Sequence, residues 1–354
     1  MNSATNDATI YRLTEYSKGA GCGCKISPKV LKDILSESVS FPDGSLIVGN
    51  SDSDDAAVYD LQNGQALIST TDFFMPIVDD AYSFGKIAAA NAISDVYAMG
   101  GTPLLSVAIL GWPEKIPATE ARKVLAGARE VCAQAKISMA GGHSIESAEP
   151  FFGLAVNGMV ALERLKRNNT AREGDLIFIT QPIGIGILAT AQKRKVITED
   201  DVTFLLAELS SLNSIGEAVG SIGEVSAMTD ITGFGLAGHL LEMAEGSGLS
   251  AVLEYSKVPI YERAKHYLKQ RVMPDATYRN WNSMSDKIEV AKSVDFMEAF
   301  GMLPDPQTNG GLMVAVSPSG KEKLISLFEQ SGLQEFVHPI GYFTEKKEKT
   351  ILVQ

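Results

Sequence analysis

The 354-residue chain is 45% hydrophobic, enough to bury a large core and to form about two domains. Its 31 basic and 43 acidic residues leave a net charge of −12, which disfavours non-specific binding to nucleic acid phosphates. The longest apolar runs, residues 103–112 and 151–162, are shorter than the roughly 20 residues that span a bilayer. We therefore expect neither a nucleic acid nor a membrane as partner.

The first residues and the cysteine usage indicate a cytoplasmic location with reduced thiols. Residues 1–9 are polar and include an acid, which is not the pattern of a secretory signal. Three cysteines at no zinc-like spacing and four histidines argue against a disulfide framework or a structural zinc site. An acidic protein that handles phosphates usually does so through divalent metal ions.

Residues 19–29, GAGCGCKISPK, place Cys22 and Cys24 among glycines. A helix is predicted directly after them, with Ser27 as its N-cap and a proline at its first position. A thiolate beside Lys25 and ahead of a helix N-terminus is electrostatically favoured, which lowers its pKa. The segment is not a Walker A motif, because Cys24 rather than glycine precedes Lys25 and neither serine nor threonine follows it.

Two β-like runs, residues 56–61 and 65–70, flank Asn63-Gly64, a strong hairpin signal. A two-residue turn there would place Asp55 directly opposite Asp72. Facing like charges destabilise a sheet, so this register predicts a bound cation, and residues 50–55 supply further oxygen ligands. The alternative is a solvated acidic loop beside a hairpin of different register.

A helix is predicted over residues 83–99, and it places Asn91 and Asp95 on one face. Asp95 there is either exposed at a helix edge or paired with a metal ion. Further elements are predicted as a strand over 104–110, a helix over 118–135 and a strand over 152–160. Cys132 follows the apolar periodicity of its helix, which predicts a small buried hydrophobic side chain.

Paired glycines precede His143 and Ser144 in the stretch 140–144. Such glycines let backbone amides approach an anion, to which His143 or Ser144 could donate. An ordinary turn is the alternative interpretation of the same residues.

A polar, basic stretch at residues 163–169 predicts a domain boundary. We expect a glycine-rich leader with a first helix over 1–48, an N-terminal ATP-binding domain over 49–163 and a C-terminal domain over 164–354. The glycines at 184–189 superficially match a dinucleotide fingerprint, but the required acid does not end a second strand, because a helical stretch over 203–219 follows instead. These glycines predict a tight strand-to-helix turn.

In residues 228–239, Asp230 and a glycine-rich backbone lead into an apolar helix. A helix N-terminus suits an anion, and Asp230 could hold the cation of that anion. Residues 305–311 form a turn or loop before a strand over 312–316, and a helix over 321–331 and two short strands follow. The dispersed aspartates 55, 72, 95 and 230 suggest several magnesium ions that hold a polyphosphate.

Several long motifs in this order resemble the selenophosphate synthetase (selenide, water dikinase) family. The resemblance covers the chain from about residue 10 onward and lies in Gly19-Ala-Gly-Cys22-Gly-Cys24-Lys25, Asp54-Asp55-Ala-Ala-Val, Ser69-Thr-Thr-Asp72-Phe-Phe, Asn91-Ala-Ile-Ser-Asp95, Gly141-Gly-His-Ser144, Thr229-Asp230-Ile-Thr-Gly-Phe-Gly-Leu-Ala-Gly-His239 and Asp305-Pro-Gln-Thr-Asn-Gly-Gly311. Asn309 stands where the family often has serine.

The resemblance implies a mixed α/β (α+β) fold of two domains, similar to aminoimidazole ribonucleotide synthetase, with N-terminal domains that pair in a homodimer. It also implies the reaction of ATP, water and selenide to selenophosphate, AMP and orthophosphate, and it leaves room for a selenium-delivery protein. The aspartate-rich site would bind Mg²⁺ and ATP, as expected where phosphoryl transfer depends on positioning and metal charge.

By resemblance, the site residues fall into four groups. Cys22 is the catalytic position and Lys25 the nearby base that contacts ATP. The magnesium ligands are Asp55, Asp95 and Asp230. The remaining ATP contacts are Asp52, Ser53, Asp54, Asp72 and Asp95, and the residues that reach the partner subunit's ATP are Gly142, His143 and Ser144.

Two other classes of protein share part of this pattern. Superfamily relatives such as thiamine-monophosphate kinase or a hydrogenase-maturation protein have aspartate-rich ATP sites, but we do not expect the Gly-Cys-Gly-Cys-Lys leader in them. A selenium or metal carrier could use Cys22 and Cys24, but it would not need an entire ATP-type domain.

Overall fold

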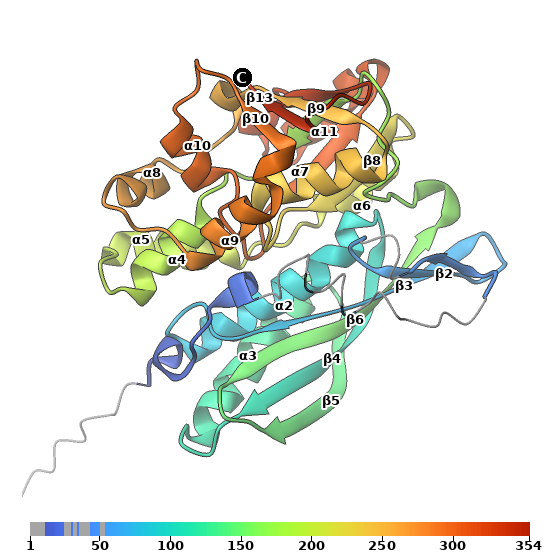
Figure 1. The fold of residues 1–354 in the computed structure, drawn as a ribbon. Coiled ribbons are helices and arrows are strands. Elements are labelled where there is room, and N and C mark those ends of the chain that lie inside the picture. The colour runs from blue at the N-terminus through green and yellow to red at the C-terminus, as the bar shows by residue number, and fades with distance from the viewer. Residues whose placement is uncertain (1–10, 25–29, 31–33, 35–42, 50–53) are drawn as a thin grey trace, which may run out of the picture.

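The computed structural model describes residues 11–24, 30, 34, 43–49 and 54–354. These residues form two β-sheets with helices on them (Figure 1), which is the mixed α/β architecture expected from the sequence. The first sheet has six strands in the order β1-β2-β3-β6-β4-β5, and the second has seven in the order β10-β13-β9-β12-β7-β11-β8. The first sheet therefore uses residues 46–161 and the second uses residues 176–353.

The strands of the first sheet are β1 (Leu46–Val48), β2 (Ala57–Asp60), β3 (Gln65–Phe74), β4 (Thr102–Trp112), β5 (Ser138–Glu146) and β6 (Phe151–Ala161). Those of the second are β7 (Leu176–Ile179), β8 (Val225–Asp230), β9 (Ser250–Leu253), β10 (Ile288–Val290), β11 (Leu312–Val316), β12 (Gly341–Thr344) and β13 (Ile351–Val353). The α-helices are α2 (Ala81–Ala98), α3 (Ala118–Gln134), α4 (Ile185–Lys193), α5 (Glu199–Leu209), α6 (Ile215–Gly220), α7 (Gly235–Gly246), α8 (Glu262–Lys269), α9 (Asp275–Met284), α10 (Phe296–Met302) and α11 (Lys321–Gln330).

Helix α2 lies between the two halves of the molecule (Figure 1) and contacts elements of both, including β3, β6 and β8. It begins at Ala81 because the Asp80 side chain accepts a hydrogen bond from the Ser83 amide at 2.7 Å and caps the first turn. Gly85 lets α2 approach α3 closely, since a Cβ there would lie 1.9 Å from the Val124 carbonyl oxygen. Nearly the whole of α2 is buried, which fits a helix that joins two sheets.

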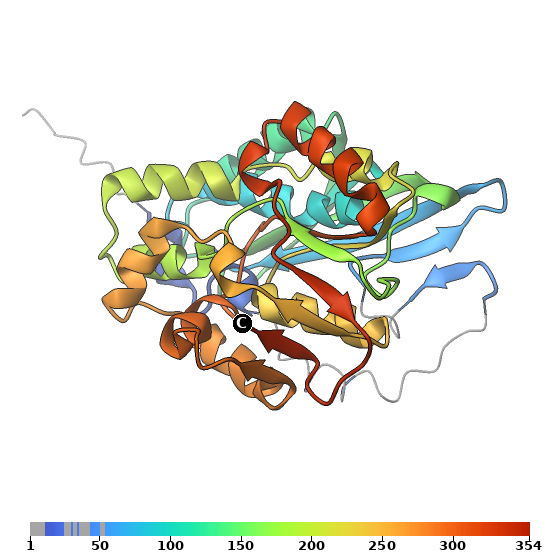
Figure 2. The same cartoon turned by 90° about the horizontal axis from the view of Figure 1, so that it is seen from above.

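The second sheet is apolar on both faces, and residues of β11 alternate between them. Leu312, Val314 and Val316 belong to one core with Leu324 and Phe328 of α11. Met313 and Ala315 belong to the other core, on the side of α7. Helices α11 and α7 accordingly lie on opposite sides of this sheet (Figure 2), as expected for strands that are buried on both faces.

The hairpin register predicted from the sequence is wrong by one residue. Ala57 pairs with Ser69 and Val58 with Ile68, and the loop holds three residues rather than two. The Leu61 amide donates to the Gln65 carbonyl at 3.0 Å, and Gln62 takes a φ of 60° inside the loop. Strand β2 begins only at residue 57, so Asp55 and Asp72 are not a facing pair.

Two further elements differ from the predictions. Residues 140–144 are not a turn but part of β5, an exposed strand that pairs parallel to β4. The stretch 203–219 is not one helix, because residues 210–214 separate α5 from α6. The strand-to-helix turn at Gly184 is confirmed, and no helix in the described part of the chain is long and apolar enough to cross a membrane.

Candidate active site

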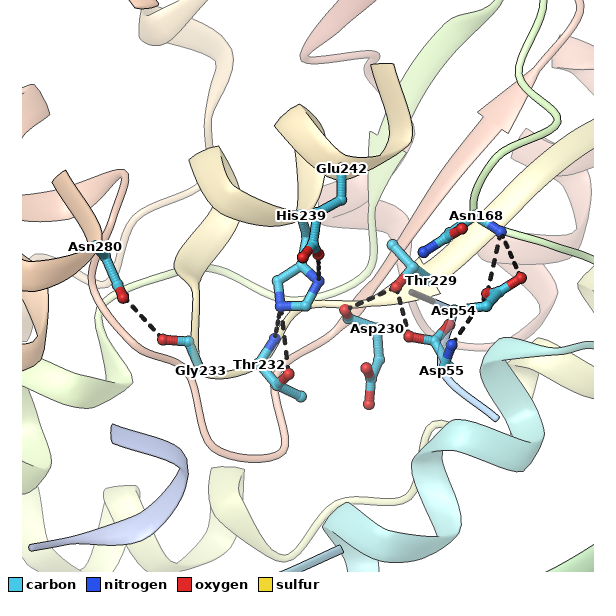
Figure 3. A network of polar contacts seen from close by, with 10 residues as sticks. All are labelled: Asp54, Asp55, Asn168, Thr229, Asp230, Thr232, Gly233, His239, Glu242 and Asn280. Carbon is cyan, nitrogen blue, oxygen red and sulfur yellow. Dashed lines mark hydrogen bonds and ion pairs between the residues drawn. The ribbon is translucent and has the colours of Figure 1, made fainter. Parts of the chain in front are cut away.

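Carboxylates from three separate elements approach one another where the two halves of the molecule meet. Asp54 and Asp55 lie just before β2, Asp95 lies on α2, and Asp230 is the last residue of β8. Figure 3 shows Asp54, Asp55 and Asp230 next to one another. Asp95 and Asp230 are both buried, with 9% and 1% of their surface exposed. Three of the predicted site positions, Asp55, Asp95 and Asp230, are thus brought together.

The ionised form of Asp55 is unfavourable, because Asp55 is buried and three further carboxylates lie close to it. Burial raises the pKa of Asp55 well above its usual range, and the charges of Asp230, Asp54 and Asp95 raise it further. The Thr229 hydroxyl donates to Asp55 Oδ1 at 2.7 Å and opposes this shift. Asp55 Oδ2 is buried and has no hydrogen-bond partner among the described residues. A cation bound at this oxygen would offset the repulsion between the carboxylates and would also give the buried oxygen a partner.

The donor set fits magnesium with a phosphate ligand better than a metal site made of protein alone. Over the residues that the structure describes, no three Asp, Glu, His or Cys side chains form a group that could hold a metal ion by themselves. Mg²⁺ usually takes one or two carboxylates and completes its octahedral shell with water and substrate phosphates. The buried Asp55 oxygen, with carboxylates nearby, is suited to such a shared site.

Three of these carboxylates, those of Asp54, Asp55 and Asp95, accept hydrogen bonds from neighbouring polar groups. Thr70 on β3 donates its hydroxyl to Asp95, and the backbone amide of Asn168 donates to Asp54 Oδ1 at 3.2 Å. Asn168 lies in the segment that connects the two sheets. The carboxylate pair before β2 is therefore tied to the second half of the chain as well as to the first.

Asp72 lies on β3 and is held by a different chain of contacts. Asn91 on α2 donates its side-chain amide to Asp72 Oδ2 at 2.6 Å. The Asn91 side-chain oxygen accepts the backbone amide of Asn309 at 2.7 Å. Residues 305–311, whose role was open from the sequence, thus reach a predicted ATP residue through one buried asparagine.

The turn between β8 and α7 is fixed by two buried side chains to which the sequence interpretation gave no role. His239 Nε2 accepts the backbone N–H of Thr232 at 3.1 Å, which assigns the ring proton to Nδ1, 3.4 Å from Glu242 (Figure 3). The Asn280 side chain donates to the Gly233 carbonyl at 2.9 Å. The position of His239, four residues into a helix that follows a glycine-rich turn, was the available signal for this contact.

The cysteine-containing leader lies against the end of β3 and the loop of residues 305–311. Residues Gly21–Cys24 form one 3₁₀ turn, and the Gly21 amide donates to the Met75 carbonyl just beyond β3 at 3.0 Å. The predicted ATP contacts Lys25, Asp52 and Ser53 lie outside the described residues.

The remaining predicted contacts are not near this cluster. Gly142, His143 and Ser144 are exposed on β5, at the opposite edge of the six-stranded sheet from β1 and β2. Cys132, in contrast, behaves as predicted: it is buried with 1% of its surface exposed, and its sulfur lies 3.5 Å from Ser106 Oγ.

Comparison with known families identifies the class of protein. The model of the AIR synthase related protein N-terminal domain matches residues 53–160, and that of the C-terminal domain matches residues 172–354. Thiamine monophosphate kinase from Aquifex aeolicus superimposes with a TM-score of 0.66 at 17% identity, over 92% of this chain and 95% of that chain. Hydrogenase maturation protein HypE in complex with ATP superimposes with a TM-score of 0.62 at 18% identity, over 98% and 94%. The chain has the two-part fold of AIR synthase related proteins.

A much closer relative defines the family within this class. The selenide, water dikinase of Shewanella sp. (strain MR-4) is 53% identical over 328 residues, which is 92% of each chain. The chain belongs to the selenide, water dikinase family and is a kinase. The non-enzymatic carrier considered from the sequence is thereby set aside.

Proposed function

We propose that this kinase makes selenophosphate from selenide, ATP and water and releases AMP and orthophosphate. One phosphoryl group passes to selenide as a P–Se bond forms and a P–O bond breaks, and a second passes to water. The observation that supports the proposal is the junction of Asp55, Asp95 and Asp230, where a buried carboxylate oxygen has no partner among the described residues. A relative with 53% identity that is named for this reaction supports the choice of substrate.

In this proposal, Asp55, Asp95 and Asp230 hold magnesium, and Asp52, Ser53, Asp54 and Asp72 contact the nucleotide. Bound Mg²⁺ would neutralise charge on the transferring phosphoryl groups. The protein contributes orientation: Thr229 fixes Asp55, Thr70 fixes Asp95 and Asn91 fixes Asp72. Held carboxylates need little rearrangement when the nucleotide binds. The ATP complex of hydrogenase maturation protein HypE, which has this fold, supports ATP as the nucleotide.

Cys22 and Lys25 are proposed to take part in phosphoryl transfer to selenium, each in a different role. A thiolate is a strong nucleophile and metal ligand, so Cys22 would carry or deliver the selenium nucleophile, and Lys25 would neutralise phosphate charge. The backbone of Gly21–Cys24 lies in the same part of the molecule as Met75 and Thr308, which supports this placement. The role of Cys24 is left open by this proposal.

We further propose a homodimer in which Gly142, His143 and Ser144 of one subunit reach the nucleotide of the other. The exposed position of these residues on β5 and the exposed apolar side chains Phe73, Leu105 and Ile145 of the same sheet support a partner surface there. We also propose that the domain boundary lies near residue 164. A selenium-delivery protein is proposed as a further partner.

Anaerobic phosphorus NMR of the protein with ATP and magnesium, with and without selenide, tests the reaction. We expect a selenide-dependent selenophosphate signal together with AMP and orthophosphate. ADP as the only nucleotide product would contradict the proposal and favour a simple kinase reaction. A Cys22→Ser variant that keeps full activity would contradict the role of Cys22.

A further inference from the structure

The described part of the leader, residues 11–24, lies between the two halves of the molecule and contacts both. We call these residues the leader from here on. On the side of the first half, the Asp79 carbonyl accepts the Leu13 amide at 3.2 Å and the Met75 carbonyl accepts the Gly21 amide at 3.0 Å. Leu13 is fully buried. Over the described residues, three basic side chains of the second half bind the leader. Lys195 pairs with Glu15 at 2.6 Å, and the other two bind backbone carbonyls on either side of Cys22.

Lys193, the last residue of α4, binds three consecutive backbone carbonyls of the leader. Its Nζ lies 3.1 Å from the oxygen of Ser17, 2.9 Å from that of Lys18 and 2.9 Å from that of Gly19. A lysine ammonium has three donors and no acceptor, so these carbonyls use its full donor capacity. The contact ends three residues before Cys22 in the sequence and fixes the base of the segment that carries it.

Arg279 on α9 binds the leader between its two cysteines. Its Nη2 donates to the Gly23 carbonyl at 2.9 Å, and a Cβ at Gly23 would be 3.6 Å from the Ala276 side chain. Gly21 is held more closely, since a Cβ there would lie 2.5 Å from Thr308 Oγ1, and its φ is +50°. Residues 21–23, which we call the tip of the leader, therefore fit closely against the second half of the molecule, and we call this contact site the docking position.

The loop of residues 305–311 connects this docking position to the nucleotide side. Asp305 Oδ2 accepts the Gly186 amide at 2.9 Å and Gln307 Oε1 accepts the Gly184 amide at 3.1 Å, which caps the helix that ends in Lys193. The same loop places Thr308 against Gly21, and its residue 309 binds Asn91, the partner of Asp72. One loop thus relates the leader to a predicted ATP residue through these contacts.

We propose that Lys193 and Arg279 are positioning residues for the reaction: Lys193 fixes the pivot of the leader, and Arg279 docks its tip so that Cys22 is presented to the nucleotide. Neither side chain needs to touch the substrate. The inference rests on the proposed role of Cys22, but the docking itself is measurable without turnover.

The test uses the full-length Lys193→Met and Arg279→Met variants, with a methionine at the exposed Lys269 of α8 (Lys269→Met) as a matched control and Lys193→Arg as a conservative rescue. Hydrogen exchange of the peptide that covers residues 17–24 is measured first, without nucleotide. We expect exchange about 10-fold faster in both methionine variants, because the Gly21 amide loses protection when the leader undocks. The Lys269→Met control should match wild type, and Lys193→Arg should recover at least part of the protection.

The second readout separates positioning from a merely structural role. We expect kcat for selenophosphate formation to fall on the order of 10- to 100-fold, because misplaced reacting groups cost that much, while KM for ATP stays within about threefold. Thermal melts confirm that the variants are folded. Wild-type exchange in both methionine variants, or faster exchange with an unchanged kcat, would overturn the proposal. If wild type itself makes no selenophosphate, the proposed function fails, whereas the exchange result still decides whether the leader docks as inferred.

Discussion

Asn309 illustrates how one residue can meet two local demands at once. Its backbone takes a φ of +49°, a conformation that asparagine tolerates better than most residues. Its buried side-chain amide donates to the carbonyl of Leu209 at 2.9 Å and to that of Ser211 at 2.7 Å, at the end of α5. A serine at this position would have one donor on a shorter side chain, so the asparagine adds a connection between α5 and the loop of residues 305–311.

Replacing Asn309 by serine should therefore destabilise the protein. Loss of two hydrogen bonds, one buried and one part-buried, predicts a decrease of about 1–3 kcal/mol in the free energy of unfolding. Urea denaturation of the Asn309→Ser variant measures it. Asn309→Asp keeps the backbone preference but removes both donors, so it should be at least as destabilising. Equal stability of wild type and the serine variant would contradict this account.

At the scale of elements, α4 depends on a buried acid. Asp305 accepts the amides of Gly186 and Ile187 at the start of the helix, yet burial raises its pKa to about 8. The hydrogen bonds from Gln307 and these amides oppose the shift without cancelling it. The N-terminus of α4 already binds the carboxyl group of Asp305 and is not available to a pyrophosphate, which explains why the glycines at 184 and 186 are not a dinucleotide site.

This raised pKa predicts how stability depends on pH. Between the ordinary aspartate pKa near 4 and about pH 8, the folded state holds a proton at Asp305 that the unfolded chain releases. The contribution is fully present below pH 4 and is lost as pH rises through about 8. In the Asp305→Asn variant, the free energy of unfolding should fall less as pH rises. The difference should be a few kcal/mol, the order expected for a shift of several pKa units. Urea denaturation at pH 5 and pH 8.5 compares the two proteins, and parallel losses in both would refute the prediction.

The same scale shows what could be predicted from the sequence. Helical periodicity placed Asn91 and Asp95 on one face of α2, and both side chains do lie at the site, where Asn91 donates to Asp72 and Asp95 accepts from Thr70. The hairpin register failed because Gln62 adopts a positive φ and lengthens the turn, which the Asn-Gly pair alone does not reveal. A one-residue error of register moves every side chain to the other face, so the predicted pairing of Asp55 with Asp72 failed with it.

The misassigned β5 has a similar physical cause. Gly141 and Gly142 suggested a turn, but they lie at an irregularity where β5 spends one more residue than β4 between paired positions. A Cβ at Gly142 would lie 2.3 Å from the Ala108 carbonyl oxygen, so glycine is required by the close approach of the neighbouring strand. Glycine pairs mark both turns and such bulges, and only the position of the neighbouring strand distinguishes them. The contacts of Asp54 with Asn168 and of Asp55 with Thr229 were out of reach for the same reason, since they join distant parts of the chain.

At the scale of the whole molecule, the carboxylate site is a point where function opposes stability. Asp55 and Asp95 come from the first sheet and its helix, and Asp230 comes from the second sheet. Their mutual repulsion acts across the junction of the two halves, which the hydrogen bond of Thr229 to Asp55 helps to hold together. Magnesium held jointly by these carboxylates and nucleotide phosphates would tighten this junction, so the nucleotide with its metal should stabilise the whole chain and not one half alone.

The Asp55→Asn variant tests this balance. It keeps an oxygen for the Thr229 hydroxyl and removes one of the crowded charges, so without ligand we expect it to be more stable than wild type by about 0.5–2 kcal/mol. Wild type should gain stability on addition of Mg²⁺ with a non-hydrolysable ATP analogue, and the variant should lose most of that gain because a proposed metal ligand is missing. Thermal melts with and without the ligands measure both effects, with the exposed Asp286→Asn as a control that should follow wild type. An unliganded variant less stable than wild type, or an undiminished gain on ligand addition, would show that Asp55 supports the fold and does not hold the metal.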